Sequence, residues 1–422
     1  MRLEIILAED ICKAYGAVST PVEVIDFMLQ VSGIERWENL NILEPGCGFC
    51  DFLKRIYTKY PNNRFTGIEY NLEVYKLITS LYSQFELIYA DFILWEPREK
   101  YDLVIGNPPY GIIGDKSHYP IYVMKEKKAL YKKNCETWFG KYNIYGAFIE
   151  KGIRVLKDRG KLVFIVPATF MILDEFKKLR KFLATLGKVK IYYLGPKIFK
   201  GRNVSTCVLV VEKGLKGLEL YEVKELKHIK KYYEKDIYNG EIIRFETPET
   251  LNFEKDGIPL GSIFSFHFAA RSTEIERLPF VSKEPKKGFV PVLTGRNLHP
   301  NWIDYESCYS GLWMPKKYAP LLRFFYGFPH LVVGHTKGGK VVAAVDYQCY
   351  PWREEIHLVP KVQGININKV ANYLNSEEVQ EYMKQLYKEI TPHITITQLK
   401  ILPLRRKEYG CFTKLTLIPT IS

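Results

Sequence analysis

The chain contains 422 residues, 47% of them hydrophobic, which is enough for two domains that each bury a sizeable core. No signal peptide, run of about 18 apolar residues or tandem repeat is recognisable, so the sequence argues against a secreted, membrane-spanning or solenoid protein and favours a soluble cytoplasmic one. The formal net charge of +14 excludes an acidic protein.

The basic excess is unevenly distributed along the chain. Residues 1–100 contain 10 basic and 15 acidic side chains, a net charge of −5. Residues 101–240 contain 28 and 14, a net charge of +14, and residues 241–422 contain 23 and 18, a net charge of +5. This distribution indicates a polyanionic partner such as nucleic acid, with a generic surface of solvated lysines as the alternative.

Strand and helix signals alternate between residues 20 and 212. Such alternation is typical of an α/β fold with a doubly wound, mostly parallel sheet. Seven strands are expected, the first entering a glycine-rich turn and a helix at 51–60: 41–48, 64–69, 87–92, 101–105, 161–166, 190–194 and 205–211. Ligands of these sheets bind at the carboxyl ends of the strands, and the distinctive residues of the chain lie there.

The first three strand ends predict a nucleoside-containing cofactor. Gly46 lets the backbone approach a ligand closely, and Glu69 is placed like the acid that binds both ribose hydroxyls. Asp91 could accept a hydrogen bond from an adenine amine, with Phe92 beside the ring. The turn carries neither G-x-G-x-x-G nor a Walker lysine, which disfavours nicotinamide cofactors and ATP. Each acid alone could be a helix N-cap, but together they indicate S-adenosylmethionine.

Cysteine and histidine spacing gives no metal site. The eight cysteines lack the spacing of a disulfide framework, and Cys47 and Cys50 form a single C-x-x-C without a second pair. Two reduced thiols are therefore expected there, rather than a redox or metal centre. Four histidines also lack metal-ligand spacing, and no metal is expected: His330, His335, His357 and His393.

The fourth strand ends in Asn107-Pro108-Pro109-Tyr110, a turn suited to activating a planar amine. The exocyclic amine of adenine is a poor nucleophile, because its lone pair is delocalised into the ring. The Asn107 oxygen and the Pro108 carbonyl can accept its two N–H groups, so that the nitrogen pyramidalises. Tyr110 offers a face for stacking, worth roughly 1–3 kcal/mol per base. An ordinary Asn-Pro turn is the alternative.

The remainder of the chain reads as a linker and a second domain. Residues 213–250 are polar and lack strong periodicity, so we place the linker there and the boundary near 240, giving domains 1–240 and 241–422. Basic and aromatic residues then alternate around Arg271, Arg296, Lys337 and Arg353, as in loops that contact phosphates and base edges. Surface loops can look the same. No P-D-x-n-(D/E)-x-K nuclease core is evident.

These motifs and their order resemble the adenine-N6 DNA methyltransferases, and within them the TaqI type of restriction-modification systems. The resemblance covers nearly the whole chain and is carried by these runs: 18–28, 43–45, 90–92, 106–111, 141–148 and 166–169. It implies the class I S-adenosylmethionine-dependent methyltransferase fold followed by a mixed α/β recognition domain. The family's Glu-Pro-Ala-Cys-Ala run is altered at Gly46 and Gly48, which changes loop flexibility.

The resemblance also implies a role for each matching residue. The methionine part of the cofactor would be held by Thr20, Glu44, Pro45, Gly46 and Cys47. Its nucleoside would be held by Glu69, Asp91, Phe92 and Pro109. Phe199 would be a second aromatic on the target base beside the catalytic Asn107, Pro108 and Tyr110. DNA would be contacted by Arg202, Arg271, Arg296, Lys337 and Pro392. Arg202 replaces a family lysine, which alters phosphate geometry, and Pro392 matches the residue that packs on the orphan thymine.

The implied activity is site-specific methylation of adenine in double-stranded DNA after base flipping, with 5′-TCGA-3′ as the expected target. We expect a monomer, accompanied by a separate cognate restriction endonuclease. Three alternatives stay open. Protein-glutamine methyltransferases share Asn-Pro-Pro-Tyr but lack a large basic C-terminal domain, and RNA methyltransferases use similar chemistry. A non-catalytic DNA-specificity subunit would show decayed cofactor motifs, whereas those motifs are intact here.

Overall fold

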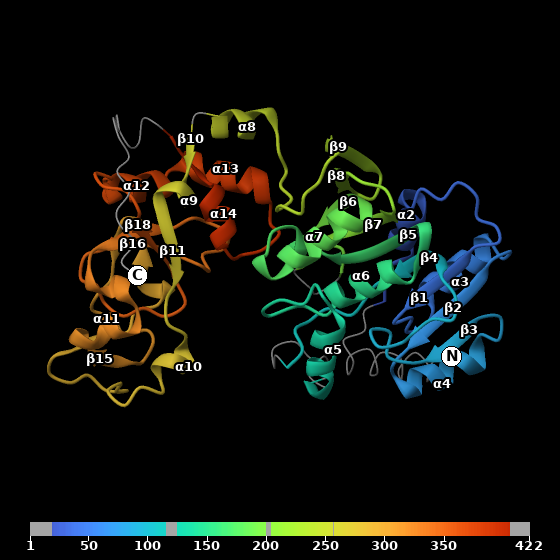
Figure 1. Ribbon diagram of the computed structural model, residues 1–422, viewed down its shortest axis with the longest axis horizontal. Coiled ribbons are helices and arrows are strands. Elements are labelled where there is room, and N and C mark those ends of the chain that lie inside the picture. The colour runs from blue at the N-terminus through green and yellow to red at the C-terminus, as the bar shows by residue number, and fades with distance from the viewer. Residues whose placement is uncertain (1–18, 115–124, 200–203, 256, 406–422) are drawn as a thin grey trace. The chain divides into compact units, whose positions relative to one another are not determined.

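The computed structural model describes residues 19–114, 125–199, 204–255 and 257–405. The chain divides into two compact units, Met1–Arg244 and Phe245–Ser422 (Figure 1). The division falls after residue 244, whereas the sequence places the boundary near 240. Arg202, expected on DNA, lies outside the described residues. Within the described ranges, no helix is both long and apolar enough to cross a membrane.

A large sheet forms the centre of the N-terminal unit, with nine strands among the described residues in the order β3-β2-β1-β4-β5-β7-β6-β8-β9 (Figure 1). The strands are β1 (Asn41–Pro45), β2 (Arg64–Glu69), β3 (Glu86–Tyr89), β4 (Tyr101–Gly106), β5 (Leu156–Pro167), β6 (Gly187–Gly195), β7 (Thr206–Lys213), β8 (Leu218–Lys224) and β9 (His228–Lys235). Strands β3, β2, β1, β4 and β5 pair in parallel, and β7 runs antiparallel to β5 and β6. This confirms the expected mostly parallel α/β fold.

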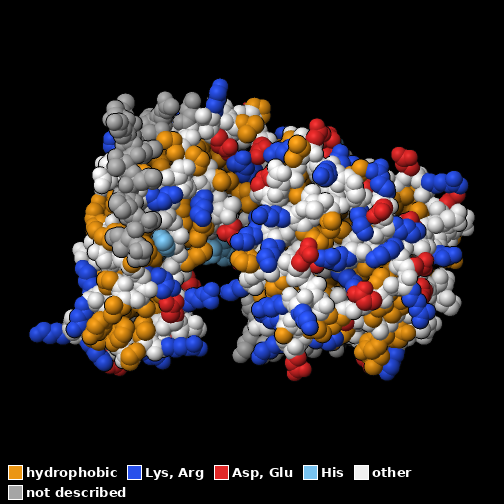
Figure 2. Space-filling model, viewed as in Figure 1, with side chains coloured by type: hydrophobic (Ala, Val, Ile, Leu, Met, Phe, Trp, Pro, Cys, Tyr) orange, Lys and Arg blue, Asp and Glu red, His pale blue; other side chains and the backbone are white. Residues whose placement is uncertain are grey.

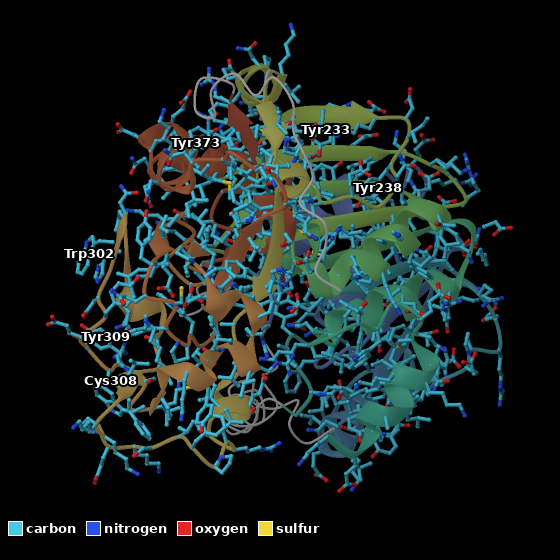
Figure 3. All side chains as sticks on the ribbon, turned by 60° about the vertical axis from the view of Figure 1, so that its left-hand side comes forward. Tyr233, Tyr238, Trp302, Cys308, Tyr309 and Tyr373 are labelled. Carbon is cyan, nitrogen blue, oxygen red and sulfur yellow. The ribbon has the colours of Figure 1, made fainter. Side chains whose placement is uncertain are left out.

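The strand count differs from the expectation. The seven expected strands are β1 to β7, but β8 and β9 extend the sheet through the stretch expected to be a linker, so that expectation is wrong. Most side chains of β9 are exposed, including Ile229, because β9 is an edge strand. A strand without a buried face leaves no apolar alternation in the sequence. Tyr233 lies on β9, and Tyr238, which follows it, is buried (Figure 3).

Burial explains why the central strands form. The apolar runs of β1, β4 and β5 are fully buried, as expected for parallel strands covered on both faces. Helix α6 packs on β5, α7 on β6, and α4 on β2 and β3. The helices of this unit are α2 (Val22–Val31), α3 (Asp51–Lys59), α4 (Leu72–Leu81), α5 (Lys128–Asn134), α6 (Tyr145–Arg154) and α7 (Lys177–Leu186), with 3-10 helices η2 (Ala168–Met171) and η3 (Asp174–Phe176).

The C-terminal unit is a mixed α/β unit around a four-stranded antiparallel sheet, β11-β18-β16-β17, which agrees with the expected class. Its strands are β10 (Gly257–Pro259), β11 (Phe264–Phe268), β12 (Phe289–Pro291), β13 (Leu298–His299), β14 (Trp302–Ile303), β15 (Trp313–Pro315), β16 (His330–Val333), β17 (Ala343–Asp346), β18 (Ile356–Pro360) and β19 (Pro403–Arg405). Its helices are α8 (Pro248–Lys255), α9 (Leu260–Ile263), α10 (Ser272–Ile275), α11 (Ala319–Leu322), α12 (Ile367–Leu374), α13 (Glu377–Tyr387) and α14 (Ile396–Ile401), with η4 (Gly295–Asn297), η5 (Lys316–Tyr318) and η6 (Phe324–Gly327).

The surface of this unit mixes basic and apolar side chains. Figure 2 shows Lys and Arg side chains spread over the visible face of each unit rather than gathered into one patch. Hydrophobic side chains gather over α11 and β15 (Figure 2). Leu321 on α11 and Phe324 on η6 are exposed. Trp302 and Tyr309 are also exposed and lie at the outer edge of the unit (Figure 3).

Candidate active site and recognition loops

The turn that carries Asn107 to Tyr110 begins where β4 ends, beside the glycine-rich turn that follows β1. Leu43 of β1 pairs with Val104 of β4, so the two strands reach the same sheet edge together. A Cβ on Gly106 would lie 3.8 Å from the Pro45 carbonyl oxygen, and one on Gly46 would lie 3.9 Å from Pro109 Cδ. Gly46 also has a φ of +63°, a conformation that favours glycine. The two turns therefore pack against each other, as strand pairing predicts.

Thr20 holds the side chain of Asn107. The Asn107 amide nitrogen donates to the Thr20 hydroxyl oxygen over 3.2 Å, and Thr20 is buried directly before α2. This contact turns the nitrogen of the amide toward Thr20 and fixes the amide plane. Thr20, expected to contact the methionine part of the cofactor, thus also orients the proposed catalytic amide.

Asn143 anchors the other end of the turn. Its side-chain oxygen accepts the Gly111 N–H over 2.7 Å, and the Gly111 carbonyl accepts the Ile144 N–H over 2.8 Å. The Tyr110 hydroxyl donates to the Ile165 carbonyl on β5 over 2.8 Å. Sequence reasoning assigned Asn143 no role, although it lies in the 141–148 run that carries the family resemblance.

Three aromatic rings meet beside the turn. The ring centroids of Tyr110 and Phe199 are 6.5 Å apart with an angle of 68° between the rings, so they contact edge to face. Tyr145, on α6, makes a second edge contact with Tyr110 at 6.2 Å. Phe199 is buried. The structure thus brings together the two aromatics expected on the target base, in contact with each other.

Glu44 and Glu69 both bind backbone N–H groups around the glycine-rich turn. Glu44 is buried, and its carboxylate accepts the N–H groups of Phe52 and Leu53 in the first turn of α3. Glu69 accepts the Gly48 N–H over 2.9 Å and the Asn71 N–H over 2.6 Å. Burial raises the pKa of both carboxyl groups. These acids therefore shape the turn that a cofactor would approach.

Asp91 lies just beyond β3, in a cage of donors that the sequence did not reveal. Its Oδ2 accepts from the Lys127 ammonium over 3.0 Å and from the Tyr131 hydroxyl over 2.6 Å. The Lys127 ammonium also lies 4.4 Å from the centre of the exposed Tyr70 ring. Phe92 is buried and packs on Phe148 at 5.2 Å. The position expected for an adenine amine is therefore held by a side-chain cation.

Cys47 and Cys50 are free, buried thiols. A hydrogen bond with Cys50 and burial raise the pKa of the Cys47 thiol well above its usual value, which makes it a poor nucleophile. A Cβ on Gly67 would lie 3.0 Å from Cys47 Sγ, so this thiol packs against β2. In the part of the chain that the structure describes, no group of three or more His, Cys, Asp or Glu side chains could hold a metal ion.

In the C-terminal unit, the basic and aromatic runs singled out in the sequence lie together. Backbone bridges join Ala270 to Arg353, Leu293 to Trp352 and Thr336 to His393. The four residues expected on DNA come from these loops: Arg271, Arg296, Lys337 and Pro392.

Three of those residues are exposed, namely Arg271, Arg296 and Pro392. Lys337 is half-buried, and its ammonium donates to the carbonyls of Gly295 and Leu298, the latter over 2.8 Å. Burial lowers the pKa of this ammonium. Lys337 thus links two loops of the unit through a contact that could not be predicted from the sequence.

Known protein families match the two units of the chain separately. Residues 27–199 match the Eco57I restriction-modification methylase family, and residues 290–404 match the TaqI-like C-terminal specificity domain. The chain is 48% identical over 415 residues to the type II methyltransferase M.TthHB8I of Thermus thermophilus, covering 95% of each protein. It is 26% identical over 184 residues to the modification methylase CviBIII of Paramecium bursaria Chlorella virus NC1A, covering 42% of this chain and 45% of that one.

Among solved structures, the chain resembles a nuclease-deletion mutant of the Type ISP restriction-modification enzyme LlaGI, which was solved with a DNA substrate mimic. The TM-score is 0.57 at 13% identity, and the match covers 91% of this chain and 54% of that one. The cryo-EM structure of the DrdV–DNA complex gives a TM-score of 0.51 at 13% identity, covering 84% and 50%. At these identities the likeness supports the fold alone.

Proposed function

Because the chain belongs to the TaqI-like type II DNA methyltransferases of restriction-modification systems, which act on adenine, we propose that it methylates the exocyclic amine of an adenine turned out of duplex DNA. Membership of this family confirms the resemblance drawn from the motifs. It also disfavours the glutamine and RNA methyltransferase alternatives and the non-catalytic subunit.

The observation that carries the proposal is the constrained turn at the end of β4. Asn107 is held by Thr20, and the backbone after Tyr110 is held by Asn143. With its nitrogen turned toward Thr20, the Asn107 amide offers its oxygen to one N–H of the adenine amine, and the Pro108 carbonyl accepts the other. The Asn107 acceptor is fixed before the substrate arrives, so catalysis is positioning and electrostatic stabilisation.

The residues around this turn fit S-adenosylmethionine, which supplies an electrophilic methyl group when bound. Gly46 and Gly48 adopt positive φ, and a Cβ on Gly48 would meet nothing within 4 Å, so the turn leaves room for a ligand. Glu69 ends β2 and Asp91 lies just beyond the neighbouring strand β3, where they would offer acceptors to ribose hydroxyls and an adenine amine. Asn107 and Pro108 would hold the adenine amine in line with the methyl group that the bound cofactor would supply, and the amine would lose its proton to solvent.

Tyr110 and Phe199 would hold the flipped base between them. A base sandwiched by two rings needs a separation of about 7 Å, twice the roughly 3.4 Å spacing of stacked bases. The observed edge-to-face contact at 6.5 Å leaves no room for one. Because the Tyr110 hydroxyl is bonded to Ile165, Phe199 is the ring that must turn when the base enters.

The C-terminal unit would read the target, for which we propose 5′-TCGA-3′. Arg271, Arg296 and Pro392 are exposed on adjoining loops, as base and phosphate contacts require. We also propose that the protein acts as a monomer in the cytoplasm, needs no metal and protects host DNA from a separate cognate endonuclease.

Sequencing of plasmid DNA for N6-methyladenine, after expression in a host that lacks adenine methylases, tests this function. We expect methylation at one position of one short sequence, and none with Asn107→Ala. Methylation at a site other than 5′-TCGA-3′ would correct the target alone. No modified adenine with soluble wild-type protein, or undiminished methylation with Asn107→Ala, would overturn the proposal.

A further inference from the structure

A buried carboxylate, Glu355, lies where the recognition loops of the C-terminal unit meet. It directly precedes β18 and is only 5% exposed. Its own carbonyl accepts the Ala269 N–H over 2.9 Å, which joins it to the loop before Arg271. A charged side chain in such a position is uncommon unless its oxygens are used.

Both carboxylate oxygens of Glu355 face the backbone of other loops. Oε2 accepts the His335 N–H over 2.6 Å. The other oxygen, Oε1, lies against Gly295, where an added Cβ would be only 2.4 Å from it, and the Gly295 N–H lowers the pKa of the carboxyl group. The carboxylate therefore bridges the 293–297 loop to the 335–340 loop.

These two loops carry residues expected on DNA. Arg296 follows Gly295 directly, and Lys337 lies two residues after His335. Lys337 adds a second link, because its ammonium donates to the Gly295 carbonyl. Gly295 thus lies between the Glu355 carboxylate and the Lys337 ammonium, which is hydrogen-bonded to its carbonyl.

We propose that Glu355 is a positioning residue for target recognition, whose two acceptor oxygens set the spacing of the loops that carry Arg296 and Lys337. This inference rests on the proposed function, since it assigns those loops to the reading of DNA. Glu355 touches no reacting group. Its substitution should therefore affect discrimination between DNA sites rather than the methyl-transfer step.

A carboxylate is needed because both partners of Glu355 are donors. A glutamine would place an NH2 group against one of the two N–H groups, and a protonated glutamic acid would place an O–H there. In either state one of the two loops loses its favourable contact with residue 355. Glu355→Gln is therefore the permanent counterpart of the protonated wild-type side chain.

The link that Glu355 makes between the two loops should weaken as the pH falls. Burial raises the pKa of Glu355 to about 7, although the His335 N–H and the Lys337 ammonium favour the charged carboxylate and lower its pKa. Glu354, exposed on the same segment, also raises it. Burial lowers the pKa of the His393 imidazole, which stacks on His335, and the charge that His393 gains at low pH favours all DNA alike. Discrimination between sites is therefore the informative readout, and affinity alone is not.

The test compares methylation rates on a duplex with the target and on one with a single changed base pair, from roughly pH 8 to pH 6. The test variants are Glu355→Gln and Gly295→Ala. The Cβ that Gly295→Ala adds would push Oε1 of Glu355 away. The control is Glu306→Gln, because Glu306 is an exposed glutamate of the same unit. We expect both test variants to lose about tenfold in discrimination at pH 8, the effect of one lost charged hydrogen bond. Their kcat on saturating target should stay within about twofold, since the reacting groups are untouched.

The wild-type enzyme should lose the same discrimination as the pH falls, whereas Glu355→Gln should show no such change. Wild-type discrimination that is constant between these pH values would overturn the inference, even if both variants fail to fold. A folded Glu355→Gln that discriminates like the wild type at pH 8 would overturn it as well. If the wild type shows no preference between the duplexes at any pH, the proposed function fails, and this inference fails with it.

Discussion

Replacing Lys127 by methionine should tighten the binding of S-adenosylmethionine. The Lys127 ammonium lies 3.0 Å from Asp91 Oδ2 and 4.4 Å from the centre of the Tyr70 ring. It thus occupies the Asp91 acceptor that the cofactor adenine would use. Binding of the adenine must displace this ammonium, which opposes the association. Methionine keeps the apolar stem of the side chain but removes the competing charge.

The expected size follows from the two contacts that must break. The Lys127 side chain is 35% exposed and that of Asp91 is 11% exposed, so the ion pair contributes about 0.2–1 kcal/mol. A partly exposed cation–π contact adds about 0.5–1 kcal/mol. A total of about 1–2 kcal/mol corresponds to a dissociation constant lowered about 5- to 30-fold.

Isothermal titration of S-adenosylmethionine into each protein measures this change. Lys132→Met, on the exposed side of α5, removes the same charge without touching Asp91 and should leave the affinity near the wild-type value. The Tyr131 hydroxyl still donates to Asp91 in both variants, so the acceptor keeps its place. Unchanged or weaker binding by Lys127→Met would refute the reasoning, because it would make Lys127 a neutral or favourable contact of the cofactor.

Substitutions at three other positions test the active site and the C-terminal core. Asn143→Ala removes the acceptor of the Gly111 N–H, and kcat should fall about tenfold with unchanged cofactor affinity. Phe199→Ala should raise the KM for DNA about tenfold through lost base stacking, and Phe199→Trp should restore it. Burial lowers the pKa of His330 and His357, so the folded protein resists protonating them and its stability falls as the pH drops below about 6.5. His357→Phe should therefore show a smaller fall in thermal midpoint between about pH 6.5 and pH 5 than the wild type.

Each of these outcomes has a counterpart that would contradict it. A normal kcat in Asn143→Ala would show that the turn keeps its shape without that hydrogen bond. Failure of Phe199→Trp to restore the KM would show that Phe199 acts through packing rather than stacking. Equal pH slopes for the wild type and His357→Phe would show that the buried pair, whose ring nitrogens lie 2.8 Å apart, does not govern acid stability.

The N-terminal fold could be predicted because its strands are buried. Apolar runs such as Leu103–Ile105 and Leu162–Val166 fill both faces of parallel strands, and the chemistry-bearing residues follow them directly. Strand β9 could not be predicted in the same way, since it places exposed lysines on an edge and carries no apolar period.

The site could be predicted only as far as each residue's place at a strand end. Asn107, Glu69 and Asp91 lie where the topology requires. Their partners come from distant segments, as when Lys127 reaches Asp91 from 36 residues away. The same holds for Glu355, whose bond to His335 spans 20 residues and depends on how the loops close. A single sequence carries no signal for such contacts.

The rate of a single round of methyl transfer by Asn107→Ala tests the central claim most directly. Wild-type and variant proteins would be mixed with S-adenosylmethionine and a duplex that contains the site found by sequencing, with Asn62→Ala, an exposed asparagine of the same unit, as control. Loss of one preorganised hydrogen-bond acceptor should slow transfer by at least about a hundredfold, while the dissociation constant for S-adenosylmethionine stays within about twofold. Transfer by Asn107→Ala at a rate close to that of Asn62→Ala would contradict the assignment of Asn107 as the residue that orients the adenine amine.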